Sequence, residues 1–247
     1  MSDAPVTPDV VGTEVVGRAL VATIDNGKAN ALSFEVLAAL GAALDRVERS
    51  EEDGPGVLVI TGRPGMLTGG FDLAVIRSGP LEAGRLVTDG GAFITRCFAS
   101  PVPVVVASTG HAIAAGALLL LGADYRVGAT GEFRIGFIET QIGMVLPRWA
   151  VELSEERLSR RHFQQATVGA RIYDPLGAVD AGFLDVAVDP DRVRDEALAE
   201  ATARKGAEGY MWNNLGTAYE HLDLPNPGLP TARMGGETPA LFEPQQP

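Results

Sequence analysis

Short apolar runs alternate along the chain with stretches of helical periodicity, and glycine-rich turns lie between them. Three runs rich in valine, isoleucine and leucine predict strands at residues 20–24, 57–60 and 104–107, and the short stretch at 125–127 predicts another. Residues 34–50 instead place apolar side chains three to four positions apart, which predicts a helix with Ser33 as its N-cap. Because strand, turn and helix recur at a spacing of roughly forty residues, the pattern predicts an α/β fold.

The predicted elements continue through the second half of the chain. Further helices are expected at residues 92–99, 112–121, 154–166 and 175–182. Further strands are expected at residues 133–135 and 183–188. The glycine- and proline-containing residues 77–91 predict a loop, which is either a lid over a pocket or a plain surface loop.

Three stretches of different character divide the sequence. Residues 1–190 form the predicted core, and residues up to about 17 are expected to be a frayed lead-in with at most one edge strand. Residues 191–222 form a C-terminal segment with a helical pattern. Residues 223–247 hold six prolines and no apolar periodicity, so an extended tail is predicted there.

Composition and charge restrict the partners. The chain has 247 residues, 46% of them hydrophobic, and a net charge of −12, which argues against a nucleic-acid partner. Its longest apolar run, residues 112–121, is too short to span a bilayer, so no membrane partner is expected. The start of the chain lacks a basic and an apolar signal region, and a cytoplasmic location is therefore expected. The single cysteine, Cys97, is predicted to be a packed thiol, and no His/Cys spacing indicates a metal site.

Two glycine-rich turns carry the candidate chemistry. Residues 66–73 and 109–116 each follow an apolar run and precede a helical stretch. A turn at a helix start leaves backbone N–H groups unpaired, and two such turns aimed at one point would stabilise a carbonyl oxygen as it becomes an oxyanion. Glu139 follows among apolar neighbours, so its pKa should be raised and it is predicted to be the base. This combination indicates an enzyme that enolises a thioester.

Four motifs in this order resemble the crotonase superfamily, the enoyl-CoA hydratases and isomerases, over residues 18–188. The motifs are Lys28-Ala29-Asn30-Ala31-Leu32, Thr68-Gly69-Gly70-Phe71-Asp72-Leu73, the segment from Gly110 to Gly116, and the segment from Gly136 to Gly143. The resemblance implies a spiral of β-β-α turns with a C-terminal helical region, assembled as a homotrimer or a dimer of trimers. It also implies that coenzyme A arrives as part of an acyl-CoA substrate and that no cofactor is bound permanently.

The same resemblance assigns roles to individual residues. The backbone amides of Phe71 and Ala115 would hold the thioester oxygen. Gly70 and Ala114, which immediately precede them in the two turns, would help to bind the coenzyme A thioester. Lys28 and Ala29 would lie where the family passes the adenosine part of coenzyme A.

One departure from the family pattern separates the possible activities. Family hydratases carry a second glutamate on the helix after the second turn, and Leu118 occupies that position here. A single Glu139 suffices to move a double bond from C3 to C2, as in the Δ3,Δ2-enoyl-CoA isomerases of fatty-acid metabolism. The alternatives are a hydratase that recruits another acid, such as Asp72, or a non-catalytic acyl-CoA-binding protein. A serine hydrolase that uses Ser108 has the least support, because no partner residues are evident.

Other polar residues near these motifs have simpler structural interpretations. Asp72 is predicted to cap a helix. His111 is expected to pack beneath the second turn, and His162 to lie on a solvated helix face. Arg157, Arg160 and Arg161 are expected to face solvent or another subunit. Residues 144–149 are expected to be either acyl-pocket lining or ordinary core.

Overall fold

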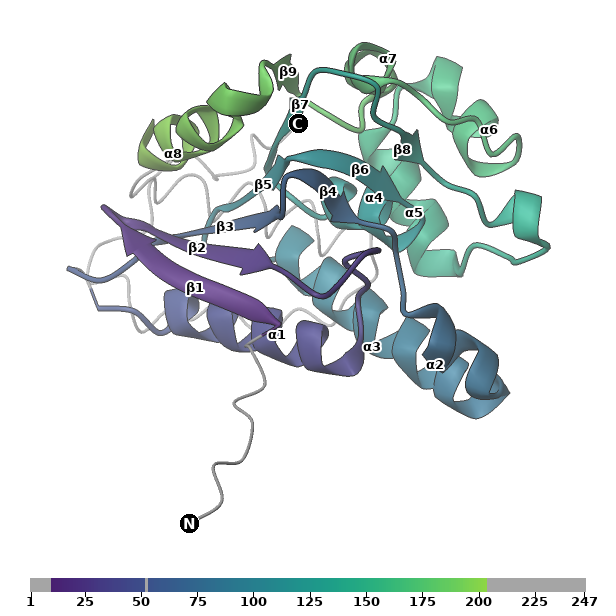
Figure 1. Cartoon of the computed structure of the whole chain (residues 1–247), viewed down its shortest axis with the longest axis horizontal. Coiled ribbons are helices and arrows are strands. Elements are labelled where there is room, and N and C mark those ends of the chain that lie inside the picture. The colour runs from purple at the N-terminus through teal and green to yellow at the C-terminus, as the bar shows by residue number, and fades with distance from the viewer. Residues whose placement is uncertain (1–9, 52, 204–247) are drawn as a thin grey trace, which may run out of the picture.

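The computed structural model describes residues 10–51 and 53–203 and contains two β-sheets with helices packed around them (Figure 1). The larger sheet has the strand order β1-β2-β3-β5-β7-β9. Its strands are β1 (Val11–Val16), β2 (Ala19–Ile24), β3 (Val57–Gly62), β5 (Val104–Ser108), β7 (Tyr125–Ala129) and β9 (Val186–Val188). Strand β1 runs antiparallel to β2, and the other pairs are parallel.

A smaller parallel sheet holds β4 (Gly65–Thr68), β6 (Gly110–Ile113) and β8 (Ile135–Gly136), in the order β4-β6-β8. Each of its strands follows a strand of the larger sheet along the chain, and β4 and β6 then lead into helices. The α/β fold and the repeated β-β-α turns expected from the sequence are therefore confirmed. Since all three strands are parallel, their carboxyl ends lie at one edge of the small sheet.

Eight α-helices cover the sheets within the described residues. They are α1 (Phe34–Glu48), α2 (Leu73–Ser78), α3 (Pro80–Phe98), α4 (Ala115–Leu121), α5 (Arg148–Arg157), α6 (Arg160–Thr167), α7 (Pro175–Ala181) and α8 (Val193–Ala203). Short 3₁₀ helices span Thr140–Ile142 and Pro190–Arg192. Ser33 caps α1 as predicted, because its hydroxyl accepts the N–H of Val36 at 3.3 Å. Every helix within residues 10–51 and 53–203 is too short or too polar to cross a bilayer.

The two faces of the larger sheet bury different cores. On one face, α1, α3 and α4 contribute to the larger cluster of buried side chains, which includes Leu40, Ile94 and Leu120. On the other face, the small residues Ala197 and Ala201 of α8 pack on the strands (Figure 1). The central strands of this sheet are buried on both faces, so their sequences are continuous apolar runs. This is why they could be predicted.

The prediction of a loop at residues 77–91 was wrong. The chain there forms the end of α2 and most of α3, and only Gly79, with φ +150°, breaks the helical path. Pro80 is the first residue of α3, where its missing N–H costs nothing. Gly90 and Gly91 are buried inside α3. Tertiary packing therefore overrides the low helix propensity of this stretch.

Four other boundaries differ from the predictions. The strand predicted at 133–135 spans Ile135–Gly136 instead. The helix predicted at 112–121 begins only at Ala115, because residues 110–113 pair as β6. The helix predicted at 154–166 is two helices, since Leu158 takes an extended conformation between them. The strand predicted at 183–188 is shortened to Val186–Val188. The edge strand of the lead-in is β1, and helix α8 occupies residues 193–203 of the segment 191–222. The rest of that segment and the tail at 223–247 lie outside the described residues.

Candidate active site

The first glycine turn connects β4 to α2. Strand β4 ends at Thr68, and Gly70 follows with φ +101°, a conformation that favours glycine. Asp72 caps α2, because its Oδ1 accepts the N–H of Ala74 at 2.8 Å. Asp72 therefore has the capping contact expected from the sequence.

The second turn connects β6 to α4. Ala114 stands between them with φ +54° and ψ −121°, an unusual conformation for a residue with a side chain. Its carbonyl accepts the N–H groups of Ala117 at 2.9 Å and Leu118 at 3.2 Å, so the α4 helix starts at Ala115. The Ala115 residue is 1% exposed.

The two turns lie against each other because β4 and β6 are neighbours in the small sheet. A Cβ atom added to Gly70 would lie 3.0 Å from the Cβ of Ala114 and 3.3 Å from the amide nitrogen of Ala115. Among the hydrogen bonds of the described residues, the N–H groups of Phe71 and Ala115 have no acceptor. Two neighbouring turns thus each present a backbone donor that a carbonyl oxygen can use.

Glu139 follows the third strand of the same sheet. The N–H of Ala114 donates to the carbonyl of Gly136 at 3.0 Å, which joins the second turn to the start of the glutamate segment. Glu139 is 9% exposed, and its carboxylate accepts the N–H of Ile138 at 2.9 Å. Burial raises the pKa of this carboxyl above its ordinary value, although backbone N–H groups of Glu139 and Ile138 partly oppose the shift. No ion pair to Glu139 occurs within the described residues.

Hydrogen bonds from a later segment hold the residues after Glu139. The hydroxyl of Thr140 donates to the carbonyl of Thr167 at 3.3 Å, and the side-chain amide of Gln141 donates to the carbonyl of Ala170 at 2.8 Å. Ala170 itself has φ +46°. The glutamate is therefore carried on a turn supported from outside the small sheet.

The loop between β2 and α1 lies alongside the first turn. The carbonyl of Ala29 accepts the N–H of Gly69 at 2.8 Å, and the side chains of Lys28 and Ala29 are exposed. The guanidinium of Arg63 donates to the carbonyls of Gly27, at 3.2 Å, and Lys28. The loop with the predicted adenosine-binding residues is thus attached to the strand that leads into the site.

Asn30 anchors this loop, a role that sequence reasoning missed. Its side-chain NH₂ donates to the carbonyls of Ile24 at 2.9 Å and Leu67 at 2.7 Å, and its Oδ1 accepts the N–H of Asn26 at 2.7 Å. The residue is completely buried with φ +50°. An asparagine in a polar break after a strand was the available signal, because asparagine tolerates this conformation.

Leu118 is 2% exposed and belongs to the larger buried cluster, so no carboxylate stands at this position of α4. His111 is partly buried, its Nδ1 accepts the N–H of Arg134 at 3.0 Å, and its ring meets Phe133 edge-on. Cys97 is completely buried, as predicted, and burial raises the pKa of its thiol.

The prediction that His162 lies on a solvated face was wrong. His162 is 6% exposed, and its ring nitrogens lie 3.2 Å from the hydroxyl of Tyr173 and 3.1 Å from Asp180. Polar partners from two other segments satisfy its ring nitrogens, which compensates for the loss of water on burial. Arg157 is also more than a solvated residue, because its Nε donates to the carbonyl of Leu121 at 3.2 Å.

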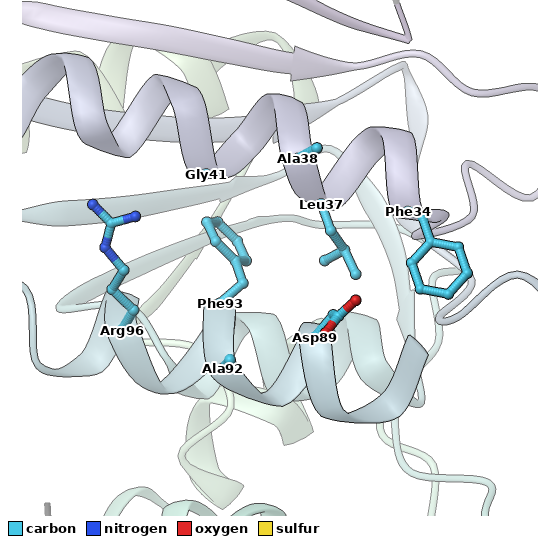
Figure 2. Close-up of a pocket in the computed structure, with 8 residues that line it drawn as sticks. All are labelled: Phe34, Leu37, Ala38, Gly41, Asp89, Ala92, Phe93 and Arg96. Carbon is cyan, nitrogen blue, oxygen red and sulfur yellow. The ribbon is translucent and has the colours of Figure 1, made fainter. Parts of the chain in front are cut away.

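A pocket of about 340 Å³ between α1 and α3 contains none of the predicted site residues (Figure 2). Its lining residues are Phe34, Leu37, Ala38, Gly41, Asp89, Ala92, Phe93 and Arg96. The candidate site is therefore defined by the three strand ends of the small sheet.

Comparisons with known proteins show what this chain is similar to. Residues 17–210 match the family described as enoyl-CoA hydratase/isomerase. The human mitochondrial enoyl-CoA delta isomerase 1 is 30% identical over 177 residues, which cover 70% of this chain and 58% of that protein. This chain thus spans less than two thirds of the human relative.

Two further similarities extend over more of the sequence. A probable enoyl-CoA hydratase from Mycobacterium avium is 29% identical over 236 residues, which cover 94% of this chain and 82% of that one. A crystal structure of an enoyl-CoA hydratase/isomerase family protein from Pseudomonas syringae superposes with a TM-score of 0.83 at 39% identity, covering 87% of this chain and 93% of the other. The names of these similar proteins include both isomerase and hydratase.

Proposed function

Because the chain belongs to the enoyl-CoA hydratase/isomerase family, we propose that it is an isomerase that moves the C3 double bond of an enoyl-CoA thioester to C2. Glu139 is its proton shuttle, and the backbone amides of Phe71 and Ala115 stabilise the thioester oxygen. Coenzyme A enters as part of the substrate, and Lys28 and Ala29 lie beside its adenosine part. No permanently bound cofactor takes part in this reaction.

The oxyanion part of the proposal is supported by the two adjoining turns. Removal of a proton from C2 moves an electron pair toward the thioester oxygen, which then carries negative charge. The N–H groups of Phe71 and Ala115 are fixed by their backbone, so they need no reorganisation to receive this charge. The absence of a side chain at Gly70 keeps the space beside the Ala115 amide open.

The proton shuttle is supported by the burial of Glu139. Its carboxylate takes the proton from C2, the dienolate forms, and the same carboxyl then returns the proton to C4. Atoms and charge balance without water or an external acid. A carboxyl whose pKa is raised by burial is a stronger base for the first step, which leaves it protonated as the proton donor for the second.

Leu118 is the observation that favours an isomerase over a hydratase. Addition of water across a C2 double bond needs a group that holds the water and a second site for a proton. The family position for that second acid is a leucine packed into the core. An apolar side chain there also disfavours water near the dienolate.

The hydratase is the second candidate, because one of the similar proteins is named a probable enoyl-CoA hydratase. Asp72 is a poor replacement for the missing acid, since its carboxylate already accepts the N–H of Ala74.

A homotrimer or dimer of trimers, and a cytoplasmic location, stay predictions from the sequence. The human relative is named as mitochondrial.

The test is turnover of a 3-enoyl-CoA to the conjugated 2-enoyl product, followed by its ultraviolet absorbance. Glu139→Gln should lower kcat by about 10²–10⁴-fold while acyl-CoA binding persists, because glutamine keeps the shape but cannot take the C2 proton. Glu132→Gln is the matched control, since this glutamate is exposed and lies between β7 and β8, a few residues before Glu139.

Each outcome separates the candidate functions. Retained activity in Glu139→Gln would exclude Glu139 as the shuttle. Water addition to a 2-enoyl-CoA at a rate similar to isomerisation would favour the hydratase. Tight acyl-CoA binding with no reaction of either isomer would instead indicate a non-catalytic acyl-CoA-binding protein.

A further inference from the structure

Two adjacent glycines inside α3 lie against aromatic rings. A Cβ atom added to Gly90 would come within 2.2 Å of Cε1 and 2.4 Å of Cζ of Phe71. A Cβ atom added to Gly91 would come within 2.6 Å of Cε2 and Nε1 of the Trp149 indole. Each glycine costs about 1 kcal/mol of helix stability relative to alanine. The close approach of the two rings explains why glycine nevertheless occupies both positions.

One ring belongs to the glycine-turn half of the candidate site, and the other to the helix that follows its glutamate half. Phe71 lies in the first glycine turn, and its main-chain N–H is one of the two proposed oxyanion donors. Trp149 lies in the first turn of α5, which follows the glutamate segment along the chain. Both side chains are partly buried against the larger core. The glycine pair therefore contacts both segments through their side chains.

One face of α3 is held against α1 by ion pairs. Arg96 donates to Asp45 at 2.6 Å and to Glu48, and Phe93 and Asp89 point toward α1 (Figure 2). Gly91 lies on the opposite side of α3 from these residues, and Gly90 lies at the edge of their face. A bulkier residue at position 90 would therefore displace the aromatic ring before it displaced the helix.

Helix α3 also touches the end of α4, the helix that begins at the second turn. A Cβ atom on Gly122, which follows α4, would lie 2.8 Å from the carbonyl of Ile94. The contact ties α3 to a third element of the site and again leaves little room for the helix to shift.

We propose that Gly90 and Gly91 are positioning residues that set the separation between the two halves of the site. Gly90 receives the Phe71 ring and thereby fixes the Phe71 amide at the place of the thioester oxygen. Gly91 receives the Trp149 indole and thereby fixes the start of α5, the helix that follows the glutamate segment. The inference rests on the proposed function, because it assigns these contacts an effect on the oxyanion donor and the base.

Gly90→Ala tests the first contact, and Gly84→Ala is its control. Gly84 lies in the same helix with no atom within 4 Å of an added Cβ, so its substitution changes helix propensity alone. We expect Gly90→Ala to lower kcat by about 10- to 100-fold, because small displacements of a donor have effects of this size, with KM changed less than threefold. Gly84→Ala should retain wild-type kcat.

A second substitution separates positioning from general damage. Phe71→Leu removes the ring atoms that meet position 90 but keeps the main-chain N–H. In this background, Gly90→Ala should lower kcat by less than threefold, because no ring is left to displace. If Gly90→Ala fails to fold by itself, a several-fold loss of kcat in Phe71→Leu with unchanged KM still tests whether the ring supports the amide.

A crystal structure of Gly90→Ala supplies a readout that does not depend on turnover. The main chain at residues 69–72 should be displaced together with the Phe71 ring. An unmoved main chain with a rotated ring, or kcat within twofold of wild type, would overturn the inference. A wild-type protein without isomerase activity would count against the proposed function, whereas the main-chain position would still decide whether Gly90 places the amide.

Discussion

Replacing Asn30 with alanine should weaken both the fold and the substrate-side loop. The buried asparagine joins the loop at Asn26 to the end of β2 at Ile24 and to β4 at Leu67, through three hydrogen bonds of 2.7, 2.9 and 2.7 Å. It does this with φ +50°, so its backbone also favours a residue that tolerates the left-handed region.

The size of the effect follows from these contacts. A buried hydrogen bond contributes about 0.5–1.5 kcal/mol net, and alanine in a left-handed conformation costs about 1–2 kcal/mol. Asn30→Ala should therefore lower the free energy of unfolding by about 3–6 kcal/mol, which is a large share of the roughly 5–15 kcal/mol of a typical domain.

Asn30→Gly separates the two contributions, because glycine adopts the same φ without strain but makes no side-chain hydrogen bond. It should be less damaging than Asn30→Ala by about 1 kcal/mol. Urea unfolding followed by circular dichroism measures both variants. A loss below about 1 kcal/mol in Asn30→Ala, or a larger loss in Asn30→Gly, would refute this account of the side chain.

Three other substitutions follow from the site geometry. Glu139→Gln should raise the free energy of unfolding at pH 7, because burial raises the pKa of this carboxyl above its ordinary value and disfavours its charged form. This gain should disappear as the pH falls below about 4, where the carboxyl is protonated in both states, and thermal unfolding against pH measures it. Gly70→Ala should abolish turnover, since φ is +101° and the new Cβ would lie 3.0 Å from that of Ala114. Tyr173→Phe should lower stability by about 1 kcal/mol by removing the hydroxyl that contacts His162 at 3.2 Å.

Opposite results would contradict each expectation. A Glu139→Gln variant less stable at pH 7 than wild type would mean that the hydrogen bond from Ile138 outweighs burial. Wild-type turnover in Gly70→Ala would show that the two turns have room to move. An unchanged unfolding midpoint in Tyr173→Phe would place His162 outside any stabilising network.

The sequence by itself determined the elements whose signals are local. Continuous apolar runs identified the central strands because both faces of the sheet are covered, and Ser33 identified the start of α1 because capping needs only its own first turn. The two glycine turns and Glu139 were found in the same way, since each lies at the end of a recognisable strand. These features depend on neighbours in the chain.

Only the tertiary structure decided the features that depend on contacts between distant segments. Helix α3 forms through residues predicted as a loop, because Gly90 and Gly91 gain the packing of Phe71 and Trp149, which no local propensity contains. His162 is buried because Tyr173 meets it from beyond its own helix. The close approach of Gly70 to Ala114 and Ala115 was likewise set by the pairing of β4 with β6, which lies outside any local sequence signal.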